Sequence, residues 1–83
     1  MLAKDIIKML MEQKEEKPAV LAGKLGITPA ALWDRLNNPK SNNITVKKFN
    51  SMLAQLECEL VVIPRARANK IDGAILVTDN EKG

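Results

Sequence analysis

The chain has no histidine, no tyrosine and a single cysteine among its 83 residues. The common zinc-binding sets and the Ser-His and Cys-His pairs of nucleophilic enzymes therefore cannot be assembled from one copy of it. Cys58 has no partner for an internal disulfide, which is typical of a reducing compartment. Glu12, Glu15 and Glu16 form the densest acidic group, and we expect them at a solvated helix end. The composition thus predicts a protein that is not an enzyme and uses no metal or cofactor.

Long hydrophobic runs are also missing. The longest are Leu60–Ile63 and Ala74–Val77, far short of the ~18 residues that a membrane span requires. Lys4, Asp5 and Lys8 are spread among the first apolar residues, which indicates an amphipathic helix and not a signal peptide. We therefore expect one cytoplasmic domain over residues 1–83, with one small core and no membrane partner.

The positive charge is unevenly distributed. Residues 17–48 hold six basic residues and one acidic residue, a net charge of +5, whereas residues 1–16 and 49–83 each carry −1. Concentrated positive charge is typical of surfaces that bind nucleic-acid phosphates. The alternative is a chance clustering of solvated side chains.

Residues 2–57 show the apolar spacing of four amphipathic helices, the first over residues 2–15. Its inner face carries Leu2, Ile6, Met9, Leu10 and Gln13, and its outer face carries Lys4, Lys8 and Glu12. The fourth helix is expected between a Thr45 cap and Glu57, with its inner face formed by Phe49, Met52, Leu53 and Leu56.

The segment 18–38 contains two short helices joined by a tight turn. Pro18 suits the first position of a helix, because its missing N–H would have no partner there, and Gly26 can adopt the left-handed conformation that ends it. Thr28 can cap a second helix that begins at Pro29 and runs to about Asn38. Such a pair of helices is the pattern of a helix-turn-helix unit.

Beyond residue 57 the pattern changes to two short β-branched segments. Glu59–Ile63 and Ala74–Thr78, with Asp72-Gly73 as a turn signal, predict a β-hairpin over residues 58–78, followed by a tail over 79–83. An isolated hairpin is marginal in water, so a second copy of the chain is expected to cover it. The expected homodimer contacts are Leu60, Val61, Val62, Ile63, Ile75 and Val77. The alternative is a hairpin packed wholly on its own helices.

Together these features resemble the phage Cro/CI repressor-like (lambda repressor-like) helix-turn-helix family. The resemblance rests on Ala22 and Gly26 four residues apart, Ile27 after them, Leu32 and Leu36 beyond, and the run Leu56–Ile63. It implies a mainly α fold, a four-helix helix-turn-helix domain (1–57) followed by a C-terminal β-hairpin. It also implies a phage or prophage transcriptional repressor that binds double-stranded DNA as a dimer on a palindromic operator.

In that family the second helix of the unit enters the major groove. Carried onto this chain, the groove-facing residues are Thr28, Pro29, Ala30, Trp33, Asp34 and Asn37. This face departs from a strong base-contacting surface, because proline and alanine offer only apolar contact and few side chains can make bidentate hydrogen bonds. Trp33 is expected either to stack at the DNA surface or to shield the junction with the next helix. Arg35 is expected either to pair with Asp34 or to reach a phosphate.

The expected phosphate contacts surround that helix. They are Lys17, Lys24, Arg35, Lys40, Ser41, Asn42, Lys47 and Lys48. The sequence thus predicts a sequence-specific DNA-binding regulator. The alternative is a protein-interaction module on the same fold, such as an antitoxin or a phage-encoded inhibitor of a host protein, for which Ala30, Ala31 and Trp33 would form an apolar docking patch.

Overall fold

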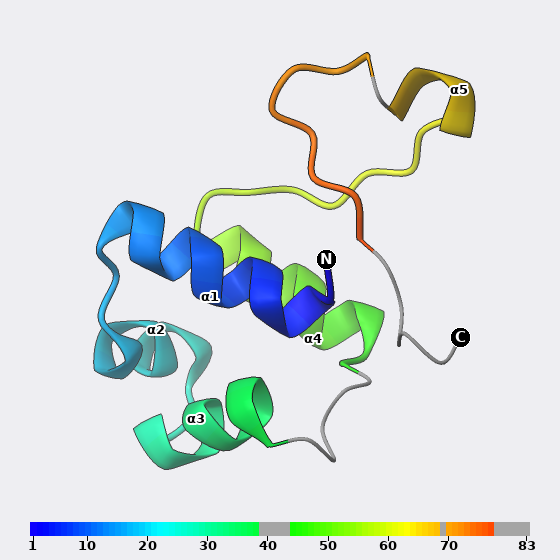
Figure 1. The fold of residues 1–83 in the computed structure, drawn as a ribbon. Coiled ribbons are helices and arrows are strands. Elements are labelled where there is room, and N and C mark those ends of the chain that lie inside the picture. Colours follow the sequence, from blue (N-terminus) through cyan, green and yellow to red (C-terminus); the bar gives the residue numbers. More distant parts are fainter. Residues whose placement is uncertain (39–43, 69, 78–83) are drawn as a thin grey trace.

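The computed structural model describes residues 1–38, 44–68 and 70–77, and the regular structure in them is α-helical (Figure 1). These residues form five helices, α1 (Ala3–Lys14), α2 (Pro18–Leu25), α3 (Pro29–Asn37), α4 (Val46–Gln55) and α5 (Arg65–Ala68). The four helices predicted between residues 2 and 57 are confirmed, each within two residues of its expected bounds.

The helix ends are set by the residues that the sequence indicated. The Oγ1 of Thr28 accepts a hydrogen bond from the N–H of Ala31 at 3.0 Å, and the Oγ1 of Thr45 accepts one from the N–H of Lys48 at 3.1 Å. Proline occupies the first turn of both α2 and α3. Gly26 ends α2 in the left-handed conformation with φ 73°. Local hydrogen bonds and backbone preferences therefore fix the turn between α2 and α3.

Substitution by alanine should change the free energy of unfolding in opposite directions at two glycines that are three residues apart. Gly23 lies inside α2 and Gly26 has φ +73°, and an added Cβ meets no atom within 4 Å at either position. We expect Gly23→Ala to raise the free energy of unfolding by about 0.5–1 kcal/mol through helix propensity. Gly26→Ala should lower it by about 1–2 kcal/mol, because only the left-handed backbone is then strained. Urea unfolding of both variants checks this, and the same sign for both would contradict it.

The core lies where α1 to α4 meet. α1 packs against α3 and α4, and α2 packs against the same two helices. Ile7, Leu21, Leu32 and Met52 are completely buried. The whole buried apolar set is Ile6, Ile7, Leu10, Met11, Leu21, Ala22, Leu32, Leu36, Phe49, Met52, Leu53 and Leu56. This core holds α3 by its Leu32 and Leu36 side and leaves its other side free.

The inner face of α1 differs from the prediction. Lys4 was expected on the outer face, yet only 9% of it is exposed, and Gln13 was expected inside, yet it is exposed. Ile7 and Met11 are buried in addition to Ile6 and Leu10. The reason is that α1 packs against two helices, so its buried stripe is wider than a single amphipathic face.

The predicted β-hairpin at 58–78 is wrong for the residues described there, 58–68 and 70–77, which contain no strand. Residues 58–64 and 74–77 have no regular structure, and α5 occupies part of the expected hairpin loop. Two short strands alone bury too little to offset their ordering, whereas the Ala-Arg repeat of α5 favours a helical turn. We call residues 59–77 the C-terminal arm.

The C-terminal arm and α3 lie on opposite sides of α1 and α4 (Figure 1). The arm is joined to the four-helix core by Leu60, which packs against the core, and by the N-terminal amine of Met1, which donates to the carbonyl oxygen of Leu76 at 2.9 Å. In the part of the chain that is described, no helix is long and apolar enough to cross a membrane.

Candidate functional site

The candidate site is the solvent side of α3 with the two helix ends near it. Leu32 and Leu36 are buried, and the six residues expected in the groove are all exposed. We call this set the α3 face: Thr28, Pro29, Ala30, Trp33, Asp34 and Asn37. The helical period thus separates core from solvent on α3 as the sequence predicted, whereas what the α3 face binds stays a prediction.

The Asp34 and Asn37 side chains of the α3 face are held by hydrogen bonds within or next to their own helix. The Nδ2 of Asn37 donates to the carbonyl oxygen of Trp33 at 2.9 Å, and the Nδ2 of Asn38 donates to the Oδ1 of Asp34 at 2.9 Å. Each of the two exposed residues has a further side-chain oxygen that can accept a hydrogen bond. The partnership of Asn38 with Asp34 was not predicted, although their i, i+4 spacing is the signal for it.

Trp33 gives the α3 face its largest apolar surface. It is 64% exposed, so it does not shield the junction of α3 and α4, which was the second interpretation of this residue. Pro29, Ala30 and Ala31 are exposed on the same helix. A large exposed aromatic side chain with small neighbours is available to stack on, or pack against, a bound molecule.

Arg35 lies at the border between the core and solvent. It is half-buried, and no ion pair joins it to Asp34 within the described residues. The Asp34 carboxylate accepts from Asn38 instead. The first of the two roles expected for Arg35, a salt bridge with Asp34, is therefore not seen among the described residues.

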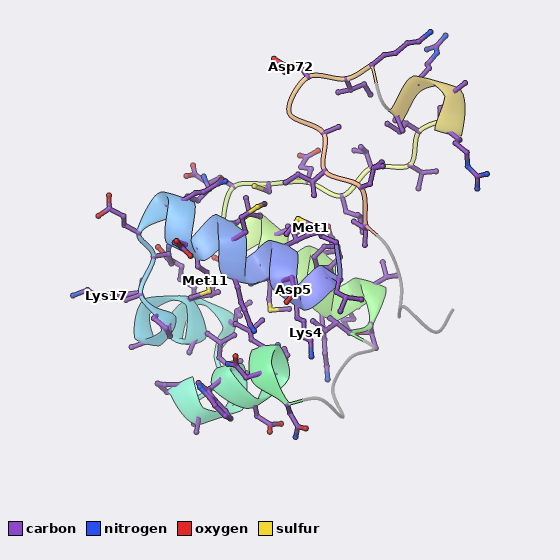
Figure 2. All side chains as sticks on the ribbon, viewed as in Figure 1. Met1, Lys4, Asp5, Met11, Lys17 and Asp72 are labelled. Atoms are coloured by element: carbon purple, nitrogen blue, oxygen red, sulfur yellow. The ribbon has the colours of Figure 1, made fainter. Side chains whose placement is uncertain are left out.

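Three exposed lysines mark the N-terminal ends of α2 and α4. Lys17 is the residue that precedes α2, and Lys47 and Lys48 lie in the first turn of α4. Neither first turn contains an acidic residue. The side chain of Lys17 projects away from the helices (Figure 2). The positive ends of two helix dipoles thus coincide with lysine charge, an arrangement that attracts anions.

Lys24 is engaged within the molecule. Its Nζ lies 2.9 Å from the Oε2 of Glu16, whose side chain is only 16% exposed. Glu16 was expected at a solvated helix end, and this part of the prediction is wrong because the connection between α1 and α2 brings it against Lys24. The charge of Lys24 is therefore already balanced by a carboxylate of the same chain.

Three of the expected phosphate contacts, Lys40, Ser41 and Asn42, lie outside the described residues. Among the described residues, α2, α3 and the start of α4 lie on the side of the molecule that faces away from the C-terminal arm (Figure 1). No three histidine, cysteine or carboxylate side chains in residues 1–38, 44–68 and 70–77 are grouped so that they could hold a metal ion.

Comparison of the chain with models of protein families, with curated proteins and with solved structures gave no match.

Proposed function

We propose that this chain is a DNA-binding transcriptional regulator of the phage or prophage repressor type, acting in the cytoplasm as a dimer on a palindromic operator. The observation that supports it most is the placement of an exposed helical face between two positively charged helix ends. α3 presents the α3 face, α2 begins beside Lys17, and α4 begins with Lys47 and Lys48. A helix flanked by phosphate-binding positions is what docking into the major groove requires.

In this proposal the contacts divide by type. Lys17, Lys47 and Lys48 bind phosphates and fix the orientation of the protein without selecting a sequence. Asp34 accepts a hydrogen bond from a cytosine amino group, and Trp33 and Ala30 pack against thymine methyl groups. Because so few side chains of the α3 face can make base contacts, DNA shape contributes to selectivity. Two copies bind half-sites about one DNA turn, ~34 Å, apart, and they repress by occluding a promoter.

The experiment that tests this function is binding of the purified protein to the DNA upstream of its own gene and to a scrambled duplex, across a salt series. A large preference for the upstream DNA at physiological salt would support an operator-specific regulator. Weak, equal binding to both duplexes that disappears at moderate salt would contradict it, because the charge would then be generic.

A protein-interaction module is the second candidate. It is favoured by one observation, the apolar character of the exposed surface formed by Ala30, Ala31 and the 64% exposed Trp33. This candidate predicts that a Trp33→Ala variant loses a protein partner while its DNA binding at low salt is unchanged. The DNA proposal predicts a loss of operator affinity for the same variant.

The dimer of the proposed function is expected to form through the C-terminal arm. Val61 is 64% exposed, Val62 is 99% exposed and Val77 is 46% exposed, whereas Leu60 and Ile63 are half-buried. Exposed clustered apolar side chains favour a second copy as cover. The described part of the arm contains no strand, so pairing with a second copy would have to order it.

A charge in the arm should separate the dimer. We expect Val62→Asp to raise the dimer dissociation constant at least about tenfold, because the carboxylate would be buried without a partner in the interface. Sedimentation equilibrium checks this. Val46→Asp is the matched control, because Val46 is 71% exposed and lies on α4, outside the arm. A wild-type chain that is monomeric at all concentrations would contradict the expected interface.

A further inference from the structure

Lys4 is a buried cation that the proposed function does not use. It lies on α1 with 9% of its surface exposed, and its Nζ is 3.5 Å from the carbonyl oxygen of Asn38. Figure 2 shows Lys4 directed away from α1 toward the end of α3. Burying an ammonium group costs free energy unless it is paired. The C-terminal end of a helix, where carbonyl oxygens point outward, is a favourable place for such a charge.

Asn38 connects this lysine to the α3 face. Its backbone N–H donates to the carbonyl oxygen of Asp34 at 3.0 Å, and its Nδ2 donates to the Oδ1 of Asp34 at 2.9 Å. Lys4 binds the opposite, carbonyl side of the same residue. A continuous series of hydrogen bonds therefore runs from α1 through the end of α3 to a carboxylate on the α3 face.

We propose that Lys4 is a positioning residue for DNA recognition, which acts through Asn38 to fix the end of α3 and the orientation of the Asp34 carboxylate. The proposal rests on the proposed function, since Asp34 must face bases for its orientation to matter. Lys4 is nearly buried, so it does not touch phosphate itself. Its loss should therefore change discrimination between sequences and not the electrostatic attraction to DNA.

The test compares Lys4→Met with Lys8→Met. Methionine keeps an unbranched apolar side chain, and Lys8 is exposed on the same helix, so the two variants lose the same charge but only one loses the contact with Asn38. We expect Lys4→Met to lower the ratio of affinities for the preferred and scrambled duplexes about tenfold, within the discrimination of one base contact. The salt slopes of the two variants should be equal, and Lys8→Met should keep the wild-type ratio.

A double-mutant cycle tests whether Lys4 acts through Asp34. In an Asp34→Ala background, Lys4→Met should change the ratio of affinities less than about twofold, because the carboxylate that it orients is gone. Asn38→Ala removes the Nδ2 contact with Asp34 and keeps the backbone oxygen. It should reproduce the loss of discrimination even if Lys4→Met folds poorly. A full tenfold effect of Lys4→Met without Asp34 would overturn the proposal.

A measurement without DNA separates this proposal from the proposed function. Trp33 is the only tryptophan, and its carbonyl oxygen accepts from Asn37 beside Asn38, so its fluorescence reports on the end of α3. We expect Lys4→Met, and not Lys8→Met, to change the collisional quenching of Trp33. If the wild type does not discriminate between duplexes, the proposed function fails. Unchanged quenching in Lys4→Met, or unchanged discrimination where the wild type has it, would instead overturn the role of Lys4.

Discussion

Leu32→Ala should lower the free energy of unfolding by about 2–5 kcal/mol, the cost of removing a buried leucine and leaving a cavity. Leu32 is completely buried in the core between α1 to α4, and it lies on α3 directly behind the exposed face. A small domain has only about 5–15 kcal/mol in total, so the melting temperature should fall by about 10 °C or more. Thermal and urea unfolding followed by circular dichroism would measure both changes.

Leu76→Ala is the matched control for this cavity. Leu76 is 55% exposed in the C-terminal arm, so the same change of side chain removes little buried surface. We expect its effect to stay within about 0.5 kcal/mol, as is usual for surface positions. Equal destabilisation by the two variants would mean that the arm is part of the cooperative core, contrary to the arrangement in Figure 1.

The region of α2 and α3 could be predicted in detail because its signals are local. The Thr28 cap, the proline that begins α3 and the left-handed Gly26 each act within one turn of the chain. The exposed side of α3 followed from Leu32 and Leu36 four residues apart. None of these requires knowledge of what α3 packs against, which is why sequence and structure agree there.

The arm could not be predicted in the same way. The β-branched run Val61–Ile63 has strand propensity, but a strand forms only when another strand pairs with it. A two-stranded hairpin from one chain buries too little apolar surface to be stable. In the described part of the arm those residues have no regular structure, and Val62 is 99% exposed. Strand propensity alone therefore predicted the wrong conformation for these residues in a single chain.

The polar contacts of the site were missed for a different reason. Lys4 and Asn38 are 34 residues apart, and Glu16 meets Lys24 only after α1 and α2 have been joined at an angle. The prediction put Lys4 on the outer face of α1, where lysine is usually found. The spacing of Lys4, Ile7 and Met11 is nevertheless that of one helix face. Polar contacts between helices depend on how the helices pack, which the pattern of a single helix does not contain.

If the proposed function is correct, Lys47→Ala/Lys48→Ala should have the largest effect on DNA binding. Both lysines are exposed in the first turn of α4, where their charge adds to the positive end of the helix dipole. Each phosphate that is no longer neutralised removes ~0.9 from the logarithmic dependence of affinity on salt. We therefore expect the slope to fall by about 1.8 and the affinity at 0.15 M salt to fall about 30-fold for operator and scrambled duplex alike.

Arg65→Ala/Arg67→Ala removes the same charge from the other end of the molecule. Both arginines belong to α5 and are exposed, and α5 lies across α1 and α4 from α3 (Figure 1). If α3 faces DNA, this control should keep the wild-type salt slope, because α1 and α4 separate its charges from the phosphates. Both variants are measured above the dimer dissociation constant, since Arg65 and Arg67 belong to the C-terminal arm. Equal loss of slope in the two variants would mean that only net charge matters, and no particular face of the domain would then be the DNA surface. A loss of salt slope in the Lys47→Ala/Lys48→Ala variant alone would place the phosphates at the start of α4, beside the exposed α3 face.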